Sequence, residues 1–147
     1  MQYFEDIDVG FVTILGPRTI TLDDSIRFCS EFDKLPIHLD SEFAKNSMYG
    51  GLIASGLHTL SVSASIVVDG FLVGTSMTGA SGMNDVRWFR PVMLPNNISV
   101  RFSVLDKLQP KPGRNFGSIK CKLESLNSDN DVVMCADVNY LFKSRCA

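Results

Sequence analysis

The sequence predicts an α+β domain in which helices come first and antiparallel strands follow. An apolar stretch from Gly56 to Val68, about 13 residues long and rich in small residues, favours a buried helix over a strand. Beyond Asp69-Gly70 the apolar residues begin to alternate with polar ones, as in Ile119, Cys121 and Leu123. One long helix ahead of a run of antiparallel strands is typical of an α+β fold.

The first elements are an extended segment and a short helix. Residues 10–20 are rich in β-branched and aromatic side chains, and Gly16-Pro17 predicts a bend within them. Thr21 is a suitable N-cap for a helix that runs to Phe32, and the acidic residues after it suit the positive end of the helix dipole. Asp33 follows directly after the expected end of this helix.

A second short helix is expected after His38, capped by Asp40 or Ser41 and running to Lys45. It ends in a glycine-rich turn over residues 46–51. Residues 127–131 predict a hairpin turn, whereas residues 109–115, with two prolines and a glycine, predict a longer loop. The expected strands are Met83–Phe89, Ile98–Leu105, Phe116–Leu126 and Val132–Phe142.

Length and charge restrict the function. The 147 residues form one expected domain, residues 1–147, and the net charge of −2 provides no broad field for nucleic acid or an anionic membrane. The acidic N-terminus does not resemble a secretory signal, and no continuous apolar run reaches the roughly 18 residues of a membrane helix. These features predict a cytoplasmic protein with no nucleic-acid or membrane partner.

The four cysteines are scattered and form no C-x-x-C pair, which argues against zinc and favours free thiols. His58 is the one further histidine available to join Asp33, His38 and Asp40 around a metal, but their spacing matches no common ligand pattern. Packing or capping is the favoured interpretation of His58, and capping of the next helix is that of Asp40. We expect no metal and no cofactor.

The segment from Asp33 to His38 is the strongest chemical signal in the chain. A carboxylate and an imidazole lie five residues apart around Pro36, and such a pair can move a proton at neutral pH. Because proline biases the residue before it away from the α region, we expect both side chains to lie on an irregular loop. The competing interpretation is a turn that ends a helix, in which His38 binds backbone groups.

Three separated motifs resemble the MaoC-like acyl dehydratases, a family that includes the (R)-specific enoyl-CoA hydratases. They follow one another in the family's order over nearly the whole chain: Asp33-x-x-Pro36-x-His38-x-Asp40, then Gly50-Gly51-Leu52-Ile53-Ala54-Ser55-Gly56, then Val86-Arg87-Trp88-Phe89-Arg90-Pro91-Val92. The resemblance implies a hot-dog fold, in which a curved antiparallel sheet wraps a long central helix. It also implies a homodimer or dimer of dimers and a role in fatty acid metabolism.

The resemblance places the catalytic pair on Asp33 and His38 and implies an acyl-CoA thioester as the substrate. Hydration of a 2-enoyl thioester requires a base for water, an acid for the α-carbon and a donor for the enolate oxygen. We expect Asp33 and His38 to handle the proton jointly. Gly56, at the start of the buried helix, is expected to offer its amide to the oxygen, with Ser55 beside it in substrate binding.

Two other functions stay open at this point. A thioesterase on the same fold would need a carboxylate on the central helix, and residues 56–68 contain none. A non-catalytic acyl-thioester binding protein is favoured if Asp33 and His38 prove too far apart to share a water molecule. A Ser-His hydrolase has little support, because Ser55 lies in no nucleophile-elbow motif.

Several further side chains carry weaker expectations. The family often has a polar residue directly before the proline, and Leu35 in that position is expected to make the site drier. Trp88 and Phe89 are interpreted as packing residues of the sheet or of a dimer edge. The candidate cations for the phosphates of coenzyme A are Arg87, Arg90, Lys111 and Arg114.

Overall fold

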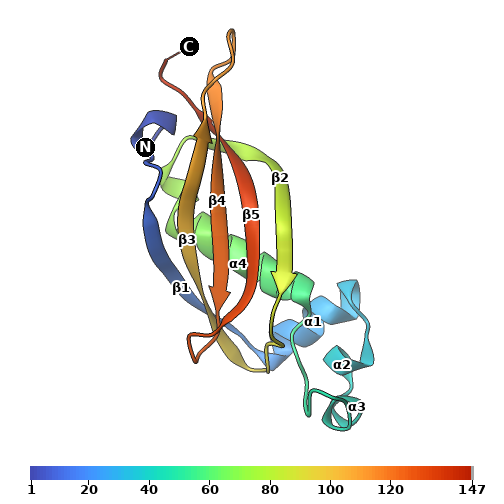
Figure 1. Cartoon of the computed structure of the whole chain (residues 1–147). Helices are drawn as coiled ribbons and strands as arrows, with labels where there is room; N and C mark the ends of the chain where they lie inside the picture. The colour runs from blue at the N-terminus through green and yellow to red at the C-terminus, as the bar shows by residue number, and fades with distance from the viewer. Residues whose placement is uncertain (147) are drawn as a thin grey trace.

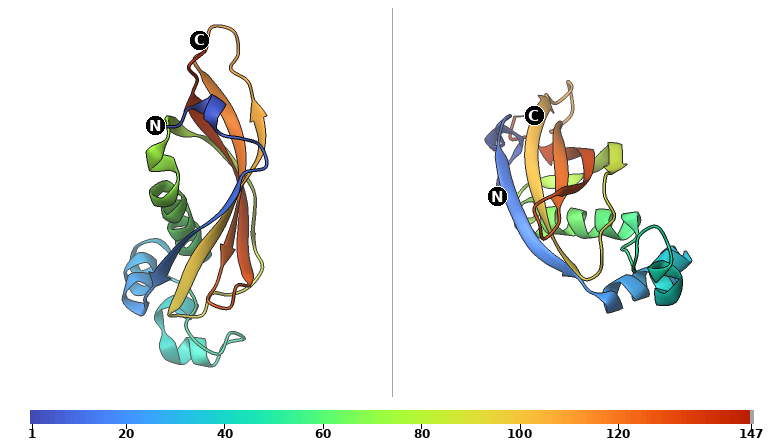
Figure 2. Two further views of the ribbon diagram at one scale, coloured as in Figure 1. Left: turned by 90° about the vertical axis from the view of Figure 1, so that its left-hand side faces the viewer. Right: turned by 60° about the horizontal axis from the view of Figure 1, so that its bottom comes forward.

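A computed structural model describes residues 1–146 of the chain. A five-stranded antiparallel sheet, with the strand order β1-β3-β4-β5-β2, curves around the helix α4, which runs along its concave face (Figures 1 and 2). The strands are β1 (Val12–Ile20), β2 (Met77–Trp88), β3 (Asn96–Leu108), β4 (Phe116–Leu126) and β5 (Val132–Lys143). This is the hot-dog arrangement that the sequence predicted.

The helices precede most of the sheet. Besides two single 3₁₀ turns, η1 (Phe4–Asp6) and η2 (Leu72–Gly74), they are α1 (Leu22–Phe32), α2 (Pro36–Leu39), α3 (Ser41–Lys45) and α4 (Gly56–Gly70). The three short helices lie together beyond one end of the sheet, close to the start of α4 (Figure 1). Both chain ends lie at the other end.

The predicted caps of the short helices are confirmed. The Thr21 side chain accepts a hydrogen bond from the Asp24 amide at 3.1 Å, and the Asp40 side chain accepts one from the Phe43 amide at 3.0 Å. The bend at Gly16-Pro17 is also present, because Gly16 has a φ of +96° and the pairing of β1 with β3 shifts register between Leu15 and Arg18.

The expected strand Met83–Phe89 was wrong at its start, because β2 begins at Met77. The missed part, residues 77–82, is rich in small residues and glycine, so it carries little of the alternation that marks a strand. The pairing of β2 with β5 is interrupted by three register shifts, and two of them fall within residues 77–82. The other strands match their predicted ranges within a few residues at each end.

The core lies between α4 and the sheet. Val62, Ile66 and Val67 of α4 are buried against strand residues such as Phe102 and Leu123. A buried hydrogen bond of 2.6 Å between the Ser63 and Ser125 hydroxyls also ties α4 to β4. The segment Gly56–Gly74 has the length and hydropathy of a membrane span, but the core helix of a folded domain passes the same test.

Candidate active site

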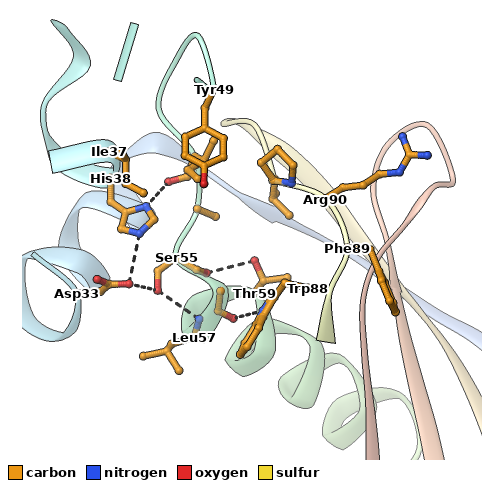
Figure 3. Close-up of a pocket in the computed structure, with 15 residues that line it drawn as sticks. Asp33, Ile37, His38, Tyr49, Ser55, Leu57, Thr59, Trp88, Phe89 and Arg90 are labelled. Carbon is orange, nitrogen blue, oxygen red and sulfur yellow. Dashed lines mark hydrogen bonds and ion pairs between the residues drawn. The ribbon is translucent and has the colours of Figure 1, made fainter. Parts of the chain in front are cut away.

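Asp33 and His38 come together from two different elements. Asp33 is the C-terminal cap of α1, and His38 lies in the single helical turn α2. The prediction of one irregular loop was therefore wrong for His38: Pro36 occupies the first turn of a helix, where its fixed φ and missing N–H are tolerated. Asp33 Oδ2 lies 3.3 Å from His38 Nε2 (Figure 3).

The orientation of His38 is set by the backbone. Its Nδ1 lies 2.8 Å from the carbonyl oxygen of Ile53. A carbonyl oxygen only accepts hydrogen bonds, so Nδ1 carries a hydrogen, and Nε2 is the ring nitrogen directed at Asp33. The imidazole is almost fully buried, whereas about one fifth of the Asp33 side chain is exposed. The pair is therefore reached from the Asp33 side.

Ser55 connects this pair to the central helix. Its hydroxyl donates a hydrogen bond of 2.7 Å to Asp33 Oδ2 and accepts one of 3.2 Å from the Leu57 amide, which makes Ser55 the N-cap of α4. The sequence had suggested substrate binding for Ser55. Its contacts hold the Asp33 carboxylate in position against the start of the helix, and Ser55 also lines the pocket, so its role in substrate binding stays a prediction.

The first amide of α4, that of Gly56, has no hydrogen-bond acceptor within residues 1–146. It lies at the positive end of a 15-residue helix, in the wall of the same pocket as Asp33 and His38. The Leu57 amide is already bound to Ser55. Of the amides in this first turn that have no acceptor within residues 1–146, those of Gly56 and His58, only Gly56 lines the pocket, where it can meet an anionic oxygen.

The pocket at this site has a volume of about 480 Å³. Strand β2 and the segment after it contribute Trp88, Phe89 and Arg90, which form the wall opposite Asp33 and His38 (Figure 3). The remaining side chains of its wall are mostly apolar: Ile37, Tyr49, Ile53, Ala54, Leu57, Pro91 and Val92. A mostly apolar pocket with a few polar groups that converge on one side is typical of a small-molecule binding site.

Sequence reasoning missed several wall residues. Trp88 and Phe89 were interpreted as packing residues, yet both line the pocket. Tyr49 and Thr59 were not predicted at all, because one lies in a turn and the other within the apolar helix pattern. Leu35, in contrast, is half exposed and does not line the pocket, so the expected drying effect of this residue was wrong.

The four candidate cations lie in different places. Arg90 lines the pocket and forms a 3.7 Å ion pair with Asp131, while Arg87 is exposed on β2. Lys111 and Arg114 lie in the β3–β4 loop. Because β3 starts beside Ile20, next to α1, and runs the length of the sheet, this loop lies at the opposite end from Asp33.

His58 does not join the pair. Its ring stacks on Phe28 with 4.6 Å between centroids, and it borders a separate cavity between α1, β1 and α4. Burial lowers the pKa of His58, partly opposed by Asp24. Cys29, buried next to Ser55 and Asp33, has its thiol pKa raised by burial, so it stays neutral and is a poor nucleophile.

Comparison with known proteins identifies relatives over most of the chain. Residues 12–120 match the family described as "MaoC like domain". A 3-hydroxybutyryl-CoA dehydratase from Methylorubrum extorquens is 28% identical over 81% of this chain and 72% of its own. The uncharacterized protein YdeM of Bacillus subtilis is 26% identical over 95% of this chain and 97% of its own.

Solved structures agree with this result. A structure described as a monoamine oxidase regulatory protein from Archaeoglobus fulgidus superposes with a TM-score of 0.88 and 32% identity, over 97% of this chain and 94% of that one. A Mycobacterium tuberculosis protein described as a double hotdog fold gives a TM-score of 0.80 at 18% identity, over 98% of this chain and 44% of that one. The second likeness concerns the fold alone.

Proposed function

Because the chain belongs to the MaoC-like dehydratase family, we propose that it adds water to, or removes it from, the double bond of a 2-enoyl-CoA thioester. The observation that carries this proposal is the 3.3 Å contact between Asp33 and His38 at the wall of an apolar pocket. The 3-hydroxybutyryl-CoA dehydratase among the relatives supports the same substrate class.

The geometry suits a water molecule held by two acceptors. In the proposal one water molecule enters from the pocket and donates one hydrogen to the Asp33 carboxylate and the other to Nε2 of the neutral His38 ring. Its oxygen lone pair is then directed at the β-carbon of the enoyl group. As the carbon–oxygen bond forms, the pair takes one proton and passes it to the α-carbon, so that the enzyme ends unchanged. The proton belongs to the coupled pair.

The negative charge that develops on the thioester oxygen needs a donor. The Gly56 amide fills this role in the proposal, because it is the unpaired first donor of α4 and the helix dipole favours negative charge there. A glycine also lets the thioester approach the backbone closely. Dehydration follows the same path in reverse.

Two features count against the alternatives. α4 has a single carboxylate, Asp69, which is exposed near its C-terminal end and far along the helix from the pocket, so a thioesterase acid on the helix is missing. A non-catalytic binding protein was favoured by a wide separation of Asp33 and His38. The distance of 3.3 Å between Asp33 Oδ2 and His38 Nε2 supports a catalytic role over binding alone.

The first test is to follow the absorbance of the enoyl-thioester band with a panel of 2-enoyl-CoA substrates. The native protein is expected to remove the band, and Asp33→Asn or His38→Gln to slow this by about 10²- to 10⁴-fold. Asp40→Asn is the matched control, because Asp40 caps α3 outside the pocket and asparagine is also a good cap. If the native protein instead releases free thiol from the thioesters, hydrolysis replaces hydration; if both single variants keep full activity, the assigned roles fail.

A further inference from the structure

Trp88, the single tryptophan of the chain, reaches from the end of β2 to the start of α4. Its indole Nε1–H donates a hydrogen bond of 3.0 Å to the carbonyl oxygen of Gly56 (Figure 3). The side chain is half exposed and lines the pocket. A tryptophan that served packing alone would not need to direct its N–H at this carbonyl.

The carbonyl that Trp88 binds belongs to a peptide unit that is held at both ends. This unit consists of the Gly56 C=O and the Leu57 N–H. Trp88 binds its carbonyl, and the Ser55 hydroxyl binds its N–H at 3.2 Å. Because Ser55 also donates to Asp33, a continuous set of contacts runs from the indole to the catalytic carboxylate.

The indole also occupies the space next to the glycine. A Cβ added at Gly56 would lie 2.7 Å from Trp88 Nε1 and 2.8 Å from its Cε2, closer than real Cβ contacts allow. Residue 56 must therefore be glycine while Trp88 keeps this position. Glycine, however, has the greatest backbone freedom of all residues, and the two peptide units on either side of its Cα rotate easily.

We propose that Trp88 is a positioning residue that removes this freedom. The Ser55 carbonyl accepts a hydrogen bond of 3.0 Å from the Thr59 amide and so holds the peptide unit before the Gly56 Cα, while Trp88 holds the unit after it. Together the two contacts set the φ and ψ angles of Gly56 and aim its N–H into the pocket. The role rests on the proposed function, in which this N–H binds the thioester oxygen. In this proposal the site needs both residues: Gly56 lets the thioester approach the backbone closely, and Trp88 restrains the glycine.

The test distinguishes the contribution of the indole N–H from that of the ring shape. Trp88→Phe keeps an aromatic ring without a donor, and replacement of the single tryptophan by benzothienylalanine keeps the two-ring shape with sulfur in place of N–H. For both proteins we expect kcat with a 2-enoyl-CoA to fall about fivefold, which corresponds to the loss of one hydrogen bond, while KM changes less than twofold. Phe43→Leu, an exposed aromatic change on α3 away from the pocket, is expected to keep kcat. An unchanged kcat in the benzothienylalanine protein would overturn the proposal, as would a loss of kcat matched by an equal loss of folded protein.

A second readout is independent of turnover. Amide hydrogen exchange at Leu57, whose N–H is bonded to Ser55, is measured by NMR and is expected to be faster in the Trp88→Phe and benzothienylalanine proteins than in the native protein, with the amides of the later turns of α4 unchanged. Equal exchange at this amide would refute the restraint. If the native protein hydrates no enoyl-CoA but the Leu57 amide still exchanges faster in both variants, the proposed function fails while the restraint of Gly56 stands.

Discussion

Ser55 shows how much one small side chain contributes at the residue scale. It is fully buried, and its hydroxyl both caps the 15-residue helix α4 and holds Asp33 Oδ2. Asp33 Oδ2 in turn is the atom that faces His38. The stability of the helix start and the orientation of the Asp33 carboxylate therefore depend on the same oxygen.

Ser55→Ala is expected to affect both properties. Loss of the N-cap should lower the free energy of unfolding by about 1 kcal/mol. The unsupported carboxylate should lower kcat with a 2-enoyl-CoA severalfold at 25 °C, where the variant is still folded. Urea unfolding and initial rates measure the two effects. Ser61→Ala, an exposed hydroxyl change on the same helix, should alter neither by much, and a Ser55→Ala protein with native kcat would separate Ser55 from catalysis.

At the element scale, α4 is held by contacts on both sides. Its inner face packs on the sheet, and its first turn meets α1 through the stacked rings of His58 and Phe28. His58 Nδ1 is buried and lacks a hydrogen-bond partner among the described residues. Burial of a ring nitrogen without a partner favours the neutral form of the imidazole, because a buried charge would be uncompensated.

This packing predicts a pH dependence of stability. Burial lowers the pKa of His58 in the folded state below its ordinary value of 6.5, with a smaller opposing effect of Asp24 and a supporting one of Arg18. The unfolded chain therefore binds more protons as the pH falls through about 6.5, and acidification favours unfolding. We expect the free energy of unfolding to fall between about pH 7 and pH 5, and to fall less in His58→Gln. Denaturant unfolding across this range measures it; parallel losses in both proteins would exclude His58 as the cause.

At the scale of the whole molecule, the two edge strands of the sheet differ in their ability to pair with another chain. β1 and β2 are the two edges, and β1 is bent at Pro17, which has no N–H to donate to a further strand. β2 is exposed along most of its length and presents Met83 and Trp88 to solvent. This asymmetry supports the expected homodimer with β2 as the contacting edge, which stays a prediction.

A charge on that edge should weaken the dimer. We expect light scattering to show a dimer for the native protein and a shift toward monomer for Met83→Lys, because two symmetry-related lysines then meet at one interface. Leu108→Lys is the control: it places the same charge on an exposed apolar residue at the end of the interior strand β3. A native monomer, or equal behaviour of the two variants, would contradict an interface at β2.

The sequence by itself determined the elements whose signals are local. Thr21 and Asp40 cap their helices through side chains that reach only a few residues along the chain, and the alternation in β4 and β5 reports burial on one face. The motif that contains Asp33 and His38 also identified the chemical pair. Such signals survive in a single sequence because each depends on neighbours in the chain.

Only the tertiary structure decided how distant segments meet. The Ser55–Asp33 hydrogen bond spans 22 residues and the Trp88–Gly56 hydrogen bond spans 32, and no local pattern encodes either of them. The start of β2 was missed for a related reason, because small residues and glycines become a strand through pairing with β5. Contacts across the fold depend on how the sheet curves around α4, and that curvature is a property of the assembled domain.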